Sequence, residues 1–359
     1  MNKSENLTSR NSSIELLRIF AMCGVVMLHY NNETAGGGFL FANNVNRIVL
    51  ILLESVCICA VNLYVLLSGY YLSATMKRRC IKPLELLVQV SIFNAALQNL
   101  GSFLEGTLSV KGILLSIIPQ NYFVILYTAV YLVSPYVNLA VSRLKDAALH
   151  KLVLLLLVVF SLWNTMIDQF QLLLNVDLSV MSTIGAKGSQ MGYTVVNFLL
   201  MYVLGAYIRR NEAHLMKLAV WKYLGMFALC GVVLTVWALV YPDVAWSYCN
   251  PVVIAMACLL MLAFLKWQFS SKWVNRLAKA SFTCFLLHGV FLTRIGIDVA
   301  VQKSLPVMLV HIVLSIAAIY VVCYVVHLVW SLVTTPVFRW IGGKLKGADQ
   351  WLQIDMQQN

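Results

Sequence analysis

The stretch SIELLRIFAMCGVVMLHYNN (residues 13–32) is a mostly apolar run of the length that crosses a bilayer as one helix. It contains two charged side chains, Glu15 and Arg18, and one histidine, His29. Eleven helical steps separate Arg18 from His29, which is within about 20° of three full turns. The sequence therefore predicts that these two side chains share one helix face, roughly 16 Å apart along the axis.

Ionisable residues inside a membrane span are costly and usually mark a functional site. Glu15 lies three residues before Arg18, so we expect the carboxylate and the guanidinium to pair on the same face. The alternative is that Arg18 only reaches back to the membrane surface, with Glu15 as its partner. Because His29 is aligned with both residues, the functional interpretation is favoured.

Composition sets the fold class. The chain has 359 residues, of which 61% are hydrophobic and only 11% are charged, whereas a soluble protein carries about 25% charged residues. We expect an all-α, polytopic helical membrane protein with about ten transmembrane helices. In the fourth span, Pro119 and Pro135 suggest that residues 108–118 form a separate short helix. The predicted spans lie near residues 13–32, 45–72, 83–104, 112–141, 151–168, 193–210, 218–241, 245–266, 279–298 and 306–336.

The positions of the basic residues predict the orientation of these spans. Of the 26 Lys and Arg residues, 20 lie in the tails or loops of one side and five on the other, with Arg18 inside the first span. Basic loops face the cytoplasm, so both termini are expected there, in a multi-pass protein of the cell membrane, as in the plasma membrane of a bacterium. The predicted organisation is a cytoplasmic tail (1–12), a transmembrane domain (13–336) and a second cytoplasmic tail (337–359). The net charge of +12 is dispersed over many loops, which argues against nucleic acid as a partner. The expected surroundings of the transmembrane domain are membrane lipids.

A second deep imidazole is predicted at His288, in the segment Ser281-Phe-Thr-Cys-Phe-Leu-Leu-His288. If the ninth span enters the membrane near Lys279, His288 lies roughly 13 Å deep and can face His29. The alternative is a core histidine bonded to a neighbouring hydroxyl group. The remaining histidines are expected in the core (His311 and His327) or at the cytoplasmic surface (His150 and His214).

A cluster of cations follows the second span. Ser68 and Gly69 lie near its end, and Arg78, Arg79 and Lys82 follow in the next loop. Several cations beside a Ser-Gly element make a candidate phosphate site, although charged residues there also serve simply to anchor the loop. The nine cysteines show no zinc-like spacing and are expected to act as small apolar residues, so no metal site is predicted.

Several of these elements, in order, resemble membrane acyltransferase family 3, the family of surface-glycan O-acyltransferases. Its hallmark is Arg or Lys, ten residues and then His in the first span, similar to Arg18 and His29, with an acidic residue where Glu15 lies. At Tyr122 the family more often has tryptophan, and the basic element is a loose match. The other similar elements are Ser68-Gly69-Tyr70, Arg79-Cys-Ile-Lys82-Pro83, Tyr122-Phe123 to Pro135, Tyr193 to Tyr207 and Ser281-Phe282 to Leu286-Leu287-His288.

The resemblance implies an acyl-CoA donor, usually acetyl-CoA, that arrives from the cytoplasm. It also implies a carbohydrate or lipid-linked glycan as the hydroxyl acceptor. Imidazole has a pKa suited to removing a hydroxyl proton near neutral pH, so His29 is the expected general base. Arg18, held by Glu15, is expected to orient the donor or to polarise the thioester carbonyl, and His288 to line the same cavity as His29. Ser68, Arg78, Arg79 and Lys82 are expected to bind CoA.

Two other classes of protein remain open. A proton-coupled transporter or exporter of a small polar or glycan-related solute would also place Arg, Glu and His inside spans. The sequence shows no inverted repeat of the kind common in such carriers. A membrane sensor without catalytic activity is the third possibility. Acetyl-CoA hydrolysis or transfer by the purified protein would separate an enzyme from a carrier.

Overall fold

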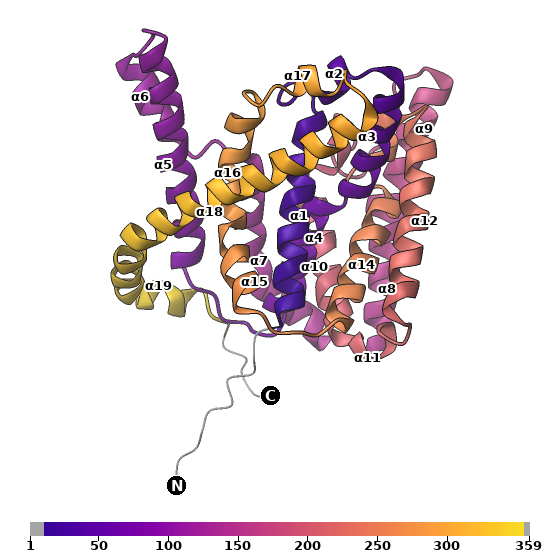
Figure 1. Cartoon of the computed structure of the whole chain (residues 1–359). Helices are drawn as coiled ribbons and strands as arrows, with labels where there is room; N and C mark the ends of the chain where they lie inside the picture. The colour runs from indigo at the N-terminus through magenta and orange to yellow at the C-terminus, as the bar shows by residue number, and fades with distance from the viewer. Residues whose placement is uncertain (1–10, 355–359) are drawn as a thin grey trace. The chain divides into compact units, whose positions relative to one another are not determined.

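The computed structural model describes residues 11–354, and within this range the chain is helical with no β-strand (Figure 1). Contacts divide the chain into two compact units, each made of segments distant in the sequence. Unit 1 contains residues 11–64, 212–246 and 252–327, and unit 2 contains residues 65–211, 247–251 and 328–354. Each unit is described by itself below.

Unit 1 contains the first predicted span and most of the C-terminal helices. Its helices are α1 (Ser12–Asn31), α2 (Gly38–Phe41), α3 (Asn44–Cys57), α11 (Glu212–Leu215), α12 (Val220–Ala238), α13 (Pro242–Ala245), α14 (Pro251–Lys266), α15 (Lys272–Leu277), η4 (Ala278–Ala280), α16 (Ser281–Leu292), α17 (Ile297–Ala300) and the first part of α18 (Leu305–Lys344). The start of α4 (Ala60–Leu72) also belongs to this unit.

Unit 2 contains the rest of α4, the middle of the chain and the last part of α18. Its other helices are α5 (Ile81–Leu104), α6 (Val110–Ser116), α7 (Tyr122–Arg143), α8 (Asp146–Leu157), η1 (Val158–Leu162), α9 (Trp163–Leu174), η2 (Ser179–Met181), η3 (Gln190–Gly192), α10 (Val195–Arg210) and α19 (Lys346–Trp351). The separate short helix expected before Pro119 is present as α6. Pro135, by contrast, lies inside α7 and does not end it.

Helix α1 begins where Asn11 caps its first turn by accepting a hydrogen bond from the Ser13 N–H. It lies beside α3 and α16 within unit 1 (Figure 1). At its far end, the Asn31 side chain donates to Glu54 of α3 at 2.8 Å, and both residues are buried. Since buried polar groups are stable only when they are paired, this contact fixes the position of α3 along α1.

The second predicted span contains a break. Helix α3 ends at Cys57 and α4 begins at Ala60, so residues 58 and 59 interrupt the helix inside an apolar run. Cys59 and Ala60 are both buried, and Gly24 of α1 lies against Cys57 and Ala60. The absence of a side chain at Gly24 thus lets α1 approach the break closely.

In unit 2, α4 and α10 approach each other through two glycines. A Cβ atom added to Gly69 would overlap the backbone of Tyr202, and one added to Gly205 would overlap the Leu66 carbonyl. Backbones that come this close leave room only for glycine. The Gly69 of the Ser-Gly-Tyr element therefore has a packing role that the sequence comparison with acyltransferases did not suggest.

Between α8 and α9 the chain forms one wide, π-helical turn, η1. Ser161 in this turn donates to the Cys249 carbonyl at 2.6 Å, and the buried Asn164 just after it bonds to Thr183. Such a turn adds one residue to the helix, so the side chains after it point in different directions from those in an uninterrupted α-helix. The helical run from Asp146 to Leu174 extends beyond the predicted span of residues 151–168.

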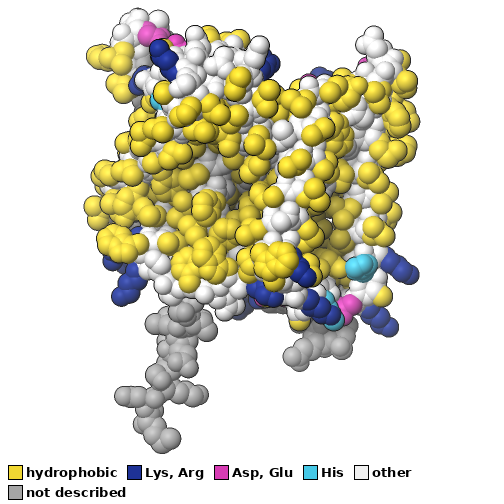
Figure 2. Space-filling model, turned by 45° about the vertical axis from the view of Figure 1, so that its right-hand side comes forward, with side chains coloured by type: hydrophobic (Ala, Val, Ile, Leu, Met, Phe, Trp, Pro, Cys, Tyr) yellow, Lys and Arg dark blue, Asp and Glu magenta, His cyan; other side chains and the backbone are white. Residues whose placement is uncertain are grey.

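Six helical segments of the described chain are long and apolar enough to cross a membrane. The predicted count of ten is therefore not confirmed, although a helix lies in each predicted span. Helices α10 and α14 have 16 residues each and α16 has only 12, which is short for a bilayer crossing. Hydrophobic side chains cover most of the face displayed in Figure 2, as expected for helices in contact with lipid.

The six segments are Ser12–Asn31, Asn44–Leu72, Tyr122–Arg143, Asp146–Leu174, Val220–Ala238 and Leu305–Lys344. The last of these continues beyond the predicted boundary at residue 336, and α19 follows it. The predicted N-terminal tail lies almost entirely outside the described residues. The side of the membrane on which each terminus lies remains a prediction.

Candidate active site

The ion pair predicted in the first span is present. Arg18 donates from Nη1 to Glu15 Oε1 at 3.0 Å, with the Glu15 side chain 6% exposed and that of Arg18 32% exposed. The hydroxyl group of Tyr64, on α4, donates to the backbone carbonyl of Arg18 at 2.8 Å. Because the carboxylate is buried, the pair depends on its hydrogen bonds more than a surface pair does, and Arg18 is held in a defined place.

The two imidazoles predicted to lie deep in the protein meet within unit 1. The rings of His29 on α1 and His288 on α16 are nearly perpendicular, with centroids 4.6 Å apart. His288 is 5% exposed, and His29 is half-buried. This contact results from the packing of α1 against α16, two helices that are separated by about 250 residues of sequence.

Both imidazoles use the same nitrogen to bond to their own helix. His29 Nδ1 lies 2.9 Å from the Val25 carbonyl, and His288 Nδ1 lies 3.0 Å from the Cys284 carbonyl. A carbonyl can only accept, so in each ring Nδ1 carries the proton. In the neutral imidazole Nε2 then carries a lone pair. His288 Nε2 is buried and has no hydrogen-bond partner among the described residues.

The distance between the ion pair and the imidazoles limits their shared chemistry. Helix α1 is continuous from Arg18 to His29, so the rise between them is roughly 16 Å. The two side chains cannot contact the same reacting atom. If His29 acts on a reacting carbonyl, Arg18 is therefore too far away to polarise the same carbonyl, and only a role in orienting a distant part of the donor fits this spacing.

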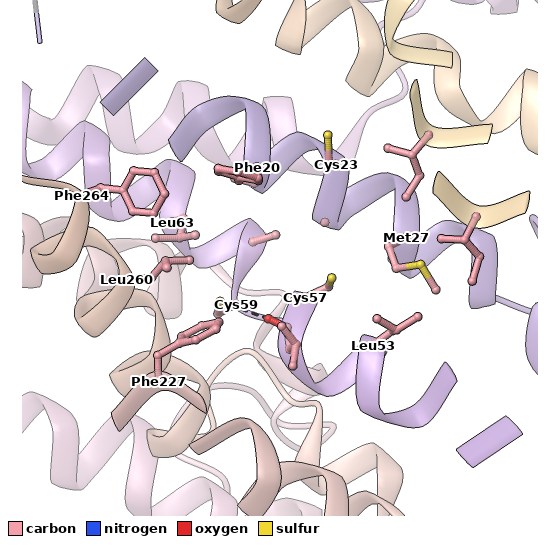
Figure 3. A pocket seen from close by; sticks show the side chains of 16 residues that line it. Phe20, Cys23, Met27, Leu53, Cys57, Cys59, Leu63, Phe227, Leu260 and Phe264 are labelled. Carbon is pink, nitrogen blue, oxygen red and sulfur yellow. Dashed lines mark hydrogen bonds between the residues drawn. The ribbon is translucent and has the colours of Figure 1, made fainter. Parts of the chain in front are cut away.

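The opposite face of α1 borders an apolar cavity of about 420 Å³ (Figure 3). Phe20 and Met27 of α1 line it, and they lie about 180–200° around the helix from Arg18. Cys23, Cys57 and Cys59 are also in the lining, and all nine cysteines are free thiols. Apart from these thiols the lining is apolar, whereas the face of α1 with Arg18 and His29 carries charged and titratable side chains.

Arg78, a predicted phosphate ligand in unit 2, is 2% exposed. All five of its side-chain N–H groups donate hydrogen bonds to other groups of the protein. Its guanidinium also lies 5.7 Å from the centre of the Tyr131 ring. With its donors taken, Arg78 holds the loop together in this structure and is not free for a phosphate. The acceptors are Ser134 Oγ, Tyr202 Oη and the carbonyls of Leu72, Thr75 and Lys77, at 2.7–3.1 Å.

Arg79 and Lys82 are exposed. The Arg79 backbone is fixed by Tyr131, which accepts from its N–H at 3.0 Å, so its side chain projects from an ordered loop. Lys82 pairs with Glu85 at 3.0 Å on the surface, where such pairs contribute little stability. Together with Lys77, which is also exposed, these side chains are the cations of this loop that a phosphate can reach. Ser68, also in unit 2, donates to Tyr127 Oη at 3.2 Å.

An acidic residue also touches this loop. Asp349 of α19 accepts a hydrogen bond from the Cys80 N–H at 2.7 Å. Burial and the nearby Asp349 carboxylate raise the pKa of Cys80 above its usual value. A thiol with a raised pKa is a poor nucleophile at neutral pH, so Cys80 is not a good candidate to carry an acyl group.

Several polar residues near the ion pair or the imidazoles were not predicted as part of a site. Tyr64 contacts the Arg18 carbonyl, and Tyr30, next to His29, contacts His311 at 2.9 Å. His327 lies 3.3 Å from Thr283 Oγ1, a hydroxyl contact typical of a core histidine. His150 and His214 are exposed, as predicted. The sequence contains no signal for these tyrosines, because their partners lie far away along the chain.

Comparison with known proteins tests the family resemblance. A family model described as an acyltransferase domain matches residues 11–333. A search of curated proteins and a search of solved structures found no match. The match covers most of the chain, including α1 and α16. The chain therefore belongs to the membrane acyltransferase family 3.

Proposed function

We propose that this membrane acyltransferase moves an acyl group, in the simplest case acetyl, from acyl-CoA to a hydroxyl group of a cell-surface or lipid-linked carbohydrate. The observation that carries the proposal is the pair of imidazoles, His29 and His288, whose Nε2 atoms are not used by their own helices. A hydroxyl group that attacks a thioester needs a nearby base, and a neutral imidazole is suited to that role.

The proposed reaction uses His29 as the general base. Its Nε2 accepts the proton of the acceptor hydroxyl as the oxygen attacks the thioester carbonyl carbon. The carbon–sulfur bond then breaks, and the departing thiolate of CoA takes up the proton from the His29 imidazolium. The products are an O-acyl ester and free CoA. His288 Nε2, buried beside His29, would accept a hydrogen bond from the acceptor and orient it.

Arg18 and Glu15 have a separate proposed role. Because Arg18 lies roughly 16 Å along α1 from His29, it would hold a polar part of the donor at a distance from the reacting carbon. The extended pantetheine arm of CoA is long enough to connect the two positions. Glu15 would keep the guanidinium of Arg18 in place through the 3.0 Å ion pair.

The donor's phosphates are proposed to bind the exposed cations Arg79 and Lys82, with Ser68 as a further polar group. Phosphate groups and cationic side chains form strong, charge-assisted hydrogen bonds. The distribution of Lys and Arg over the loops supports a cytoplasmic position for this loop and for both termini. Acyl-CoA would then arrive from the cytoplasm, at the cell membrane.

The direct test is an assay on purified protein in lipid nanodiscs with radiolabelled acetyl-CoA. We expect release of the CoA thiol, and transfer of label to a lipid-linked saccharide fraction when this is added. His29→Ala should remove both signals, whereas His214→Ala, a change at an exposed histidine, should leave them unchanged. A His29→Ala protein that is as active as the wild type would contradict the proposal. Absence of any thiol release by the wild type would favour the transporter interpretation.

A further inference from the structure

A chain of hydrogen bonds lies next to the imidazole pair in unit 1. Tyr30, which follows His29 in the last turn of α1, is 0% exposed, and its hydroxyl oxygen lies 2.9 Å from His311 Nδ1. His311 is in the second turn of α18. Its other nitrogen, Nε2, lies 2.9 Å from the carbonyl oxygen of Ile295.

The chemistry of the three groups fixes the direction of these hydrogen bonds. The Ile295 carbonyl can only accept, so His311 Nε2 carries a proton and donates it. Nδ1 of the neutral ring then has a lone pair and accepts from the Tyr30 hydroxyl. Both nitrogens of His311 are occupied, and neither is available to a substrate. The imidazole of His311 therefore connects the Tyr30 side chain to the backbone carbonyl of Ile295.

The parts that it connects are the ends of the two helices that carry the candidate catalytic histidines. Tyr30 belongs to α1, as does His29, and Ile295 lies in the turn that follows α16, seven residues after His288. Apolar packing between α1 and α16 permits small displacements, because dispersion forces have little directionality. Hydrogen bonds are directional and weaken steeply when the geometry changes.

We propose that Tyr30 and His311 are positioning residues that hold His29 and His288 in register for acyl transfer. The inference rests on the proposed function of the imidazole pair and extends it to two residues that do not touch the reacting atoms. A displacement of about 1 Å at a catalytic group can lower a rate about 100-fold. The position of the pair depends on the Tyr30–His311–Ile295 chain.

Kinetics test the proposal first. Tyr30→Phe removes only the hydroxyl group, and His311→Leu removes both ring nitrogens. Each should lower kcat about 10-fold to 100-fold and leave KM for acetyl-CoA within about twofold of the wild-type value. His311→Gln retains one donor and one acceptor and should restore most of kcat. Tyr223→Phe is the matched control, since it removes an equally buried hydroxyl that bonds to the Leu215 carbonyl on another part of unit 1.

A coupling experiment separates positioning from general stabilisation. If Tyr30 acts through the imidazole pair, Tyr30→Phe should have little further effect in a His288→Ala background, because the pair is already broken. An equal fold-loss in the wild-type and His288→Ala backgrounds would overturn the proposal. So would wild-type kcat in both Tyr30→Phe and His311→Leu.

A chemical readout does not depend on activity. Diethyl pyrocarbonate acylates unprotonated imidazole nitrogens, and mass spectrometry gives the rate at His288. The buried Nε2 should react slowly in the wild type and in Tyr223→Phe, and several-fold faster in Tyr30→Phe, whose helix ends are no longer tied. Equal rates in all three proteins would overturn the proposal. Failure of the proposed function would appear elsewhere, as transfer by His29→Ala or as no transfer by the wild type.

Discussion

The His29 and His288 rings lie 4.6 Å apart, and each donates its Nδ1 proton to the carbonyl four residues earlier on its own helix. The two histidines therefore have the same tautomer and the same free atom. In the proposed reaction, an acceptor hydroxyl beside this pair would meet two Nε2 lone pairs, one to take its proton and the other to orient it.

The first prediction concerns His29. Substitution by alanine should lower kcat for acyl transfer about 10²–10⁴-fold, which is the usual contribution of a general base. Insertion into the membrane and thermal unfolding should stay close to wild type, because the side chain is only half-buried. Thiol release from acetyl-CoA in nanodiscs measures the effect, with His214→Ala as the control.

The second prediction concerns the proximity of the two imidazoles in the membrane. Cysteines placed at positions 29 and 288 in a cysteine-free protein should be joined by a short bifunctional thiol reagent, because the native rings are in contact. After the chain is cleaved by a protease between the two positions, the cross-linked fragments should stay joined and run as one larger band on a denaturing gel. Absence of the cross-link, together with full activity of His288→Ala, would make His288 an ordinary core residue.

The third prediction concerns Arg18. Lysine keeps the charge but loses the planar fork of the guanidinium, so Arg18→Lys should retain part of the activity and Arg18→Ala much less. Glu15→Gln should resemble Arg18→Lys, since it removes the ion pair but keeps a hydrogen-bond acceptor. Rates at saturating acetyl-CoA and KM for acetyl-CoA measure these effects. Wild-type kinetics in Arg18→Ala would show that the arginine is only an anchor.

The fourth prediction separates the cations of the basic loop. Arg78→Leu should lower the unfolding temperature, because it leaves several buried acceptors unpaired at about 1–3 kcal/mol each. Arg79→Ala with Lys82→Ala should instead raise KM for acetyl-CoA and change kcat less, since contacts far from the thioester supply uniform binding. Thermal unfolding and steady-state kinetics on the same samples give both values. An unchanged KM in the double variant would place the phosphate site elsewhere.

The fifth prediction concerns Gly69. An added Cβ would meet the Tyr202 backbone, so Gly69→Ala should force α4 and α10 apart and cost about 1–3 kcal/mol of stability. Gly101→Ala is the matched control on α5, where an added Cβ meets nothing within 4 Å. Thermal unfolding in detergent compares the two. Equal stability of both variants would contradict the close approach.

The sequence predicted the limits of individual helices well where an apolar run had a clear start and end. The first span was expected at residues 13–32 and is α1, Ser12–Asn31. The break at residues 58 and 59 was not predicted, because no Pro or Gly marks it and the run is apolar on both sides. The count of ten spans was not confirmed, because apolar windows do not show that α16 ends at Leu292.

The candidate site was predictable in its residues but not in its contacts. The spacing from Arg18 to His29 fixes a shared face, because a helix is regular. That His288 would touch His29 depends on the packing of two distant helices, and it was expected only as one possibility. The burial of Arg78 was not predicted, since its acceptors include Ser134 and Tyr202 on other helices.

The wide turn η1 makes the helix from Asp146 to Leu174 one residue longer than an uninterrupted α-helix with the same ends would be. If that residue were deleted, the turn would become α-helical and α9 would rotate by about 100° relative to α8. Asn164 would then face away from Ser182 and Thr183, with which it now bonds. Homologous chains that lack the extra residue of η1 should therefore have a regular α-helix here. They should also have different side chains at the positions of Asn164, Ser182 and Thr183.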